Sequence, residues 1–311
     1  MPSTLYRPQR HQQVAEVVDL AAARARLRGT DLSGRTLLVR CSVALGDEEV
    51  LRHIGVCGDT TLEDFRGVIE KAFSLPQVDS PERFTHGYDD DGRLDPHDPL
   101  GRYLAHPGDE LFFHWGLWTF QITALEDYLR DSATPTALCV AGAGSFPDSS
   151  FDIAAVNAQL LGPTAIQAVL GQTRPEVKDV VDRAPSLDFP ALLKAMDLER
   201  PESMERRKRE TLRSLPREKS PKARDAFWAT VLAHSCMTDA STTDAVIEAT
   251  MDALGYTEAH GNKVTAAGAK RLCSGSLVRL AGIGAYGPGS ASAVDRLDVY
   301  RALLRRQGPA E

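Results

Sequence analysis

Cysteine patterns that would hold a disulfide framework or a zinc ion are missing from this 311-residue chain. Its five cysteines, an odd number, are widely spaced and never form a Cys-x-x-Cys pair. Disulfide-rich domains and zinc sites both depend on closely patterned cysteines. We therefore expect reduced, mostly buried thiols, no bound metal and no cofactor.

An excess of positive charge is also missing. The chain has 36 basic and 43 acidic side chains and a net charge of -7. No global positive field therefore attracts nucleic acid or anionic lipid, and such a contact needs a local patch. No apolar stretch of signal-peptide length opens the sequence, and no run of about 18 uncharged apolar residues stands out. We expect a cytoplasmic protein without a membrane partner.

The composition that is present, 42% hydrophobic and 25% charged, is typical of a folded protein, and the length favours two domains. Residues 14–28 repeat apolar side chains at helical spacing and stop at Gly29, which predicts an N-terminal helix within residues 1–34. Two β-rich runs, about 36–45 and 50–57, flank the turn-forming residues 46–49 and predict a hairpin.

A helix is predicted next. Residues 60–63, Thr-Thr-Leu-Glu, fit a capping box, in which the threonine hydroxyl and the glutamate satisfy free amides at the helix start. Beyond this helix we expect a short strand over 84–88, a turn-rich loop and a short element over 100–105. One helix face carries the apolar side chains Leu62, Phe65, Val68, Ile69, Ala72 and Phe73.

The stretch LFFHWGLWTFQI, residues 111–122, is the most aromatic part of the chain. Every second side chain faces inward, and this alternation shifts by one residue at Gly116-Leu117. The shift predicts a turn or bulge there, with the inward side chains of both halves pointing into one core. His114, Thr119 and Gln121 face the other way. The inward set is Leu111, Phe113, Trp115, Trp118, Phe120 and Ile122.

The element order predicts an α+β fold. We expect a mixed or antiparallel sheet with a packed helix, a grasp-like ββαβ-hairpin layout, over residues 35–150, of which 130–150 is an irregular crossing or linker. A mainly α-helical domain should follow over 151–311. In it, Ser241 opens a helix that runs to Leu254, and Thr265 caps a shorter one through Cys273.

Several apparent motifs do not carry chemistry. The acidic stretch 86–99 fails the EF-hand register. The run 282–287 has the form Gly-x-Gly-x-x-Gly after a strand-like run, but no helix start or βαβ unit follows it. Cys236 and His234 lie two apart on a predicted helix and therefore point apart. Four histidines match no metal motif: His86, His97, His106 and His114.

A local basic patch is present at residues 200–224, which contain ten basic and four acidic side chains. Its densest part is Arg206, Arg207, Lys208 and Arg209. These side chains could neutralise phosphates and bind nucleic acid in a salt-dependent way. A solvated helix face or a connector between helices is the alternative.

Residues 35 to about 150 resemble the plasmid pRiA4b ORF-3-like family, often found as passenger proteins of mobile elements. The resemblance begins with a second hairpin strand, Val50-Leu51-Arg52-His53-Ile54, and a threonine-leucine helix start at Thr61-Leu62. Phe113 to Trp118 looks like a shortened form of the family motif Y-D-F-G-D-x-W-x-H. Gly116 and Trp118 match it, whereas His114 and Leu117 stand where the family has aspartates.

Later landmarks continue the resemblance. Pro135, Cys139, Gly142, Gly144, Pro147 and Asp148 resemble the family's proline, cysteine, glycine-pair and acidic ending. Leu254-Gly255 followed by residues 264–269 is similar to a segment of longer members and of winged-helix proteins, which implies a winged-helix-like region near 241–280. The resemblance implies an α+β domain with a helical extension, and no established reaction.

Two functions remain open. The first is a non-enzymatic binding or accessory protein that contacts nucleic acid or a protein partner, with residues 206–209 as the nucleic-acid surface. The second is an unusual enzyme or small-molecule binder with a pocket at the 111–122 hairpin. There His114 would exchange a proton, because histidine titrates near neutral pH, and Asp109, Arg52 or Asp148 would orient the substrate.

Overall fold

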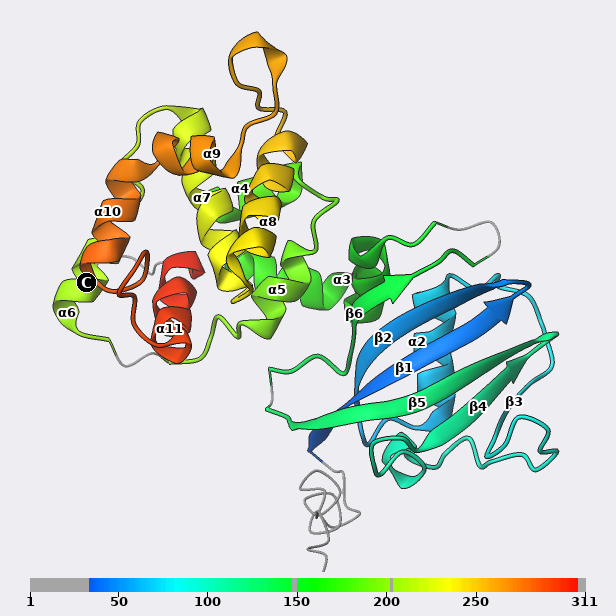
Figure 1. The fold of residues 1–311 in the computed structure, drawn as a ribbon. Helices are drawn as coiled ribbons and strands as arrows, with labels where there is room; N and C mark the ends of the chain where they lie inside the picture. The colour runs from blue at the N-terminus through cyan, green and yellow to red at the C-terminus, as the bar shows by residue number, and fades with distance from the viewer. Residues whose placement is uncertain (1–33, 132, 147–149, 202–203, 307–311) are drawn as a thin grey trace, which may run out of the picture.

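The computed structural model describes residues 34–306 except 132, 147–149 and 202–203 (Figure 1). The helix expected over 14–28 and the candidate residue Asp148 lie outside the described residues. Two bodies follow each other along the chain. We call residues 34–161 the sheet unit and residues 163–306 the helical unit. The predicted α+β class is confirmed, with an antiparallel sheet followed by a mainly helical region.

The sheet has six strands in the order β3-β4-β5-β1-β2-β6, and each neighbouring pair is antiparallel. The predicted first hairpin is confirmed, since β1 and β2 pair from Thr36 opposite Cys57 to Leu45 opposite Glu48. The strands are β1 (Arg35–Leu45), β2 (Glu48–Cys57), β3 (Glu82–Thr85), β4 (Glu110–Trp115), β5 (Trp118–Leu129) and β6 (Ala137–Ala143).

Helix α2 (Leu62–Phe73) covers one face of the sheet, and its predicted apolar face is buried except for the partly buried Val68 (Figure 1). The expected capping box is displaced by one residue. Thr61 is the N-cap, and its Oγ1 accepts a hydrogen bond from the Asp64 amide at 3.1 Å. Thr60 instead pairs with the segment around Leu100, since its carbonyl accepts a hydrogen bond from the Leu100 amide at 2.8 Å.

The aromatic stretch 111–122 forms the β4–β5 hairpin, as the shift in its alternation predicts. Gly116 has a φ of +56°, a left-handed conformation that favours glycine. Trp115 and Trp118 pair across the turn with ring centroids 5.5 Å apart. His114 and Thr119 are opposite each other on the outward face, as predicted.

Three local predictions were wrong, and a fourth, the short element over 100–105, is confirmed as a 3₁₀ turn. The expected linker 130–150 contains β6, whose pairing with β2 is hidden in the sequence by small residues. The short strand spans Glu82–Thr85 rather than 84–88, whereas the confirmed short element is Leu100–Arg102. The strand-like run before Gly282 is helix α10, because Leu277 and Leu280 are buried at helical spacing.

The helical unit is built around α7, which is buried on nearly every side. The helix expected to open at Ser241 is confirmed, but its N-cap is Asp239, whereas Thr265 caps the next helix as predicted. The helices are α3 (Ile153–Gln172), α4 (Pro175–Arg183), α5 (Phe189–Ala195), α6 (Arg206–Arg213), α7 (Pro221–Ser235), α8 (Ala240–Ala253), α9 (Ala266–Leu272), α10 (Ser274–Gly282) and α11 (Ala293–Leu304).

Helix α3 connects the two units and is broken where they meet. Gly162 has a φ of +76° before Pro163. Val156 belongs to the core of the sheet unit, whereas Val169 and Leu170 belong to that of the helical unit. Contrary to our expectation, this helix is long and apolar enough to span a membrane, by length and composition alone. A core helix of a soluble protein passes the same test.

Candidate functional site

His114 lies on β4, on the face of the sheet opposite the buried Phe113. Its Nε2 lies 2.9 Å from the Thr85 hydroxyl and its Nδ1 lies 3.1 Å from the Thr119 hydroxyl. The Thr85 hydroxyl already donates its hydrogen to the Gly87 carbonyl at 2.7 Å. It therefore accepts from Nε2–H, and Nδ1 of the neutral ring accepts from Thr119. Both ring nitrogens are occupied by threonine hydroxyls.

This environment favours neutral His114. Desolvation lowers the pKa of the imidazole, and the nearby positive charge of Arg83, its cross-strand neighbour, lowers that pKa further. A general base of this kind is normally oriented by a carboxylate, and here the two hydrogen-bond partners are hydroxyl groups. The geometry makes His114 a bridge between β3, β4 and β5.

Arg52 lies on the opposite face of the sheet from His114. In the strand pairing it is level with Cys41, Ile122 and Leu111, which share one face. His114 is three residues beyond Leu111 on β4, so its side chain points to the other face.

The Arg52 side chain is almost completely buried and joins several elements by hydrogen bonds. Its Nε donates to the Ala72 carbonyl at 2.9 Å, and its Nη1 donates to the carbonyls of Leu51, Ala143 and Gly144 at 2.7, 2.9 and 3.2 Å. The guanidinium carbon also lies 4.0 Å from the ring centroid of Phe151. Burial lowers the pKa of this guanidinium. Arg52 therefore ties the end of α2 to β2 and β6.

Asp109 lies at the far end of β4 from His114. Five residues of extended chain separate them, or about 16 Å at 3.3 Å per residue. The Asp109 carboxylate accepts a hydrogen bond from the His106 amide at 2.8 Å. The structure therefore does not bring His114, Asp109 and Arg52 together as one catalytic group.

The basic residues predicted to contact nucleic acid form the first half of α6. Arg206, Arg207 and Arg209 are exposed and Lys208 is half-buried. The Arg206 side chain is 92% exposed and pairs with Glu210 at 2.9 Å. An exposed pair of this kind contributes little stability, so it yields readily to a phosphate.

The basic surface continues beyond α6. Arg213, Arg217 and Lys219 are exposed in the last turn of the helix and in the segment after it. The Arg217 amide donates to the Ser276 hydroxyl at 2.9 Å, which holds this segment against α10. One turn further along α10, Arg279 is exposed. The sequence places Arg213, Arg217 and Lys219 in the basic patch, but it does not reveal the contact with α10 that adds Arg279, because that contact joins residues 59 positions apart.

Other titratable groups offer no catalytic pair within the described residues. Burial raises the pKa of Cys236 and lowers the pKa of His234 to about 4, and the His234 ring packs against Tyr286. Burial also raises the pKa of Cys139 to about 11. Among the described residues, no group of three histidine, cysteine or acidic side chains could hold a metal ion.

Two cavities of the described part of the chain stand out, and His114 lines neither of them. One, of about 140 Å³, lies between α2, β3 and the 93–96 loop. The other, of about 470 Å³, is a polar groove between α4 and α7, walled by Trp228 and Tyr256.

Comparison with known proteins gives a structural likeness and no family. No family model matches the chain, and no curated protein matches it. A solved structure of a protein of unknown function from Methanosarcina mazei Go1 is similar over 49% of this chain and 90% of that chain. The sequence identity is 16% and the TM-score is 0.32.

Proposed function

We propose that the protein is a non-enzymatic binding protein whose helical unit contacts nucleic acid through the basic surface of α6 and the segment that follows it. The observation that carries the proposal is the exposure of Arg206, Arg207 and Arg209 on one short helix. Among the described residues, the three arginines form one ion pair, between Arg206 and Glu210. Guanidinium groups presented in this way match the geometry of phosphate oxygens.

The arrangement on α6 suits contact with a phosphate backbone. Arg206, Arg209 and Arg213 lie at intervals of three and four residues, so they share one side of the helix. Arg217 and Lys219 continue the positive surface toward α10. Because the whole chain carries a net charge of -7, binding must depend on this local surface and not on a long-range field.

For the sheet unit we propose a divergent pRiA4b ORF-3-like domain. Three residues singled out by the resemblance, Arg52, Gly142 and Gly144, meet in one cluster. Arg52 donates to the Gly144 carbonyl, and a Cβ on Gly142 would lie 2.8 Å from the Arg52 Cδ. A shared structural role explains why these residue types occur in that order along the chain.

The test is a titration of fluorescent duplex DNA and single-stranded RNA with the full chain at 50 and 200 mM salt. The variant Arg206→Ala/Arg207→Ala/Arg209→Ala removes three exposed charges from α6. If each arginine neutralises one phosphate, the slope of log affinity against log salt should fall by about three, and binding at low salt should drop by more than tenfold.

The matched control removes three exposed cations elsewhere: Arg102→Ala/Lys178→Ala/Lys263→Ala. Their side chains are 64%, 43% and 77% exposed, and each belongs to a surface ion pair. This control should bind as the unaltered chain does. Equal binding by both triple variants, or binding that ignores salt, contradicts the proposed surface.

A further inference from the structure

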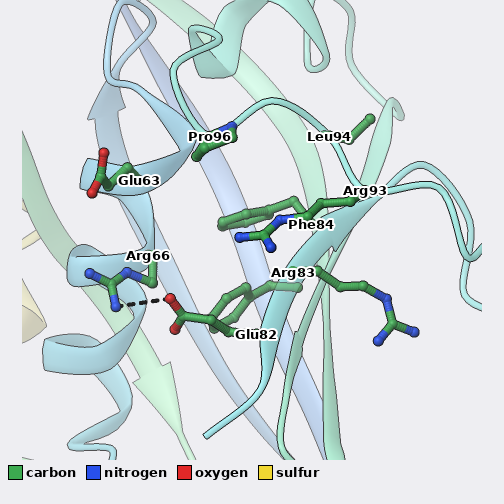
Figure 2. A pocket seen from close by; sticks show the side chains of 9 residues that line it. Glu63, Arg66, Glu82, Arg83, Phe84, Arg93, Leu94 and Pro96 are labelled. Carbon is green, nitrogen blue, oxygen red and sulfur yellow. Dashed lines mark hydrogen bonds and ion pairs between the residues drawn. The ribbon is translucent and has the colours of Figure 1, made fainter. Parts of the chain in front are cut away.

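A small cavity at the edge of the sheet has the features of a ligand site. Figure 2 shows it between the first turns of α2, strand β3 and the 93–96 loop, and we call it the edge pocket. Its volume is about 140 Å³. We propose that the edge pocket binds a small monocarboxylate with a compact apolar body, and that Arg93 holds the carboxylate.

The walls of the edge pocket are fixed by backbone hydrogen bonds. The Leu94 amide donates to the Phe84 carbonyl at 3.0 Å, and the Glu63 amide donates to the Pro96 carbonyl at 2.9 Å. The 93–96 loop is therefore attached at one end to β3 and at the other to α2. The same bond occupies an amide at the start of α2, so the loop, not a ligand, satisfies that donor.

The base of the pocket is apolar. Phe84 and Phe113 are buried, with ring centroids 4.7 Å apart, and Leu94 and Pro96 line the side. An engineered apolar cavity of about 150 Å³ binds benzene. The edge pocket is of the same size, so it accommodates one six-membered ring or a short branched chain.

The charges around the pocket leave one cation for the ligand. Arg66 forms ion pairs with Glu82 at 3.0 Å and Glu70 at 3.4 Å, and Figure 2 shows the Arg66–Glu82 pair at one side of the cavity. The Arg83 side chain points away from it (Figure 2). Arg93 turns its guanidinium toward Phe84 and has no ion pair among the described residues (Figure 2).

An arginine beside an aromatic base selects a carboxylate joined to an apolar body. Guanidinium binds carboxylate through two parallel hydrogen bonds, and the ring or branched chain then covers Phe84. Glu63 stands at the rim with a half-exposed carboxylate. Its negative charge disfavours a ligand that carries a second one, so we assign a monoanion rather than a phosphate dianion.

The experiment titrates the full chain with benzoate and isovalerate by calorimetry and by ligand-observed NMR. Arg93→Gln should weaken benzoate at least tenfold. Arg83→Gln removes an arginine on β3 whose side chain points away from the pocket, and it should leave the affinity within twofold. Glu63→Gln should tighten binding by removing the repulsive charge. Thermal unfolding of each variant checks that the fold is retained.

The neutral isostere benzamide separates the carboxylate contact from simple burial of a ring. Benzoate should bind at least tenfold more tightly than benzamide. Absence of saturable binding at millimolar benzoate and isovalerate overturns the proposal. Equal binding of benzamide, retention in Arg93→Gln, or preference for inorganic phosphate also overturns it. The pocket lies in the sheet unit, so none of these outcomes bears on the nucleic-acid surface of α6.

Discussion

The sheet unit and the helical unit bury different chemistry. The core of the sheet unit is almost entirely apolar, with a large aromatic share, and Arg52 is the one charged side chain that is fully buried among the residues described there. The helical unit buries Arg174, Asp225 and Arg301 together with several threonines and serines. Apolar burial is the main stabilising force in both, but the polar groups are satisfied in different ways.

In the helical unit, most buried hydroxyl groups are satisfied locally, with Ser276, which bonds Glu218 and the Arg217 amide, as an exception. Thr230 donates to the Ala226 carbonyl and Ser235 to the Val231 carbonyl, each one turn back on α7. Such bonds need no partner from another element, so a helix can be buried on every side. In the sheet unit, Arg52 gathers carbonyls from three different elements. Removal of Arg52 should therefore have a larger effect than removal of one of these hydroxyl groups.

The largest effect is expected for Arg52→Ala. The substitution leaves the buried Ala72 carbonyl and the partly buried Ala143 and Gly144 carbonyls without this donor and creates a cavity. We expect a loss of about 3–5 kcal/mol of unfolding free energy. Urea unfolding followed by near-UV circular dichroism of the stacked Trp115 and Trp118 pair reports on this unit.

Arg40→Ala is the matched control for Arg52→Ala. Arg40 lies on the neighbouring strand, faces the other side of the sheet and pairs with Glu49 in a partly exposed position. Its removal should cost less than about 1 kcal/mol. Equal losses in the two variants would refute the idea that one buried cation organises the sheet unit.

The contrast between Arg52 and the aromatic hairpin shows what sequence can reveal. Alternation along residues 111–122 places the hairpin and its turn, because side-chain direction in a strand follows from position alone. The role of Arg52 depends on backbone carbonyls 20 and 91 residues away. Every residue has a backbone carbonyl, so the sequence does not reveal which carbonyls Arg52 binds. For this reason a buried structural arginine looks, from sequence alone, like a candidate substrate-binding residue.

Strand β6 and the edge pocket were missed for a related reason. Gly142 is required opposite Arg52 because the arginine stem and the Phe151 ring occupy the space of a side chain. The resulting run of small residues reads as a linker. The edge pocket is assembled from residues near 63, 84 and 93, and its charge balance becomes visible only when Arg66 is seen to pair with Glu82.

An intermediate effect is expected for Gly142→Ala, which tests the same cluster from β6. A Cβ at this position would lie 2.6 Å from Phe151 Cζ and 2.8 Å from Arg52 Cδ, so both side chains must move. Overpacking of this kind costs about 1–3 kcal/mol. The measurement is the shift in the urea midpoint, with the m-value expected to be unchanged.

Gly67→Ala is the control for Gly142→Ala within the same unit. Gly67 lies inside α2, and a Cβ there meets nothing within 4 Å. Alanine should therefore stabilise the helix by about 0.5–1 kcal/mol. Opposite signs for the two glycines support close packing around Arg52, whereas a neutral Gly142→Ala would show that the cluster has room to adjust.

The smallest effect is expected at the joint between the units, where Asn157 of α3 meets Asp188 before α5. The Asn157 side chain bonds both the amide and the carbonyl of Cys139 on β6, and its Nδ2 also donates to the Asp188 carboxylate. Desolvation raises the pKa of Asp188 to about 6, aided by the negative charge of Asp152 and opposed by the Asn157 hydrogen bond.

Because the folded-state pKa of Asp188 is raised, the folded chain binds more protons than the unfolded chain between about pH 4 and pH 6. Its contribution to stability is therefore present at pH 4 and is lost as the pH rises through 6. Asp188→Asn retains an acceptor for Asn157 and carries no charge.

The unfolding free energy of this variant should match that of the unaltered chain near pH 4. At pH 7 it should be higher by about 1 kcal/mol, after allowance for solvent screening. Asp179→Asn, which removes a largely exposed carboxylate on α4, is the control for loss of a surface charge. The measurement is the difference in unfolding free energy between variant and unaltered chain from pH 4 to pH 8. A stability difference that is constant with pH, or that favours the aspartate at pH 7, would show that water reaches Asp188. Burial of its charge would then not destabilise the joint between the two units.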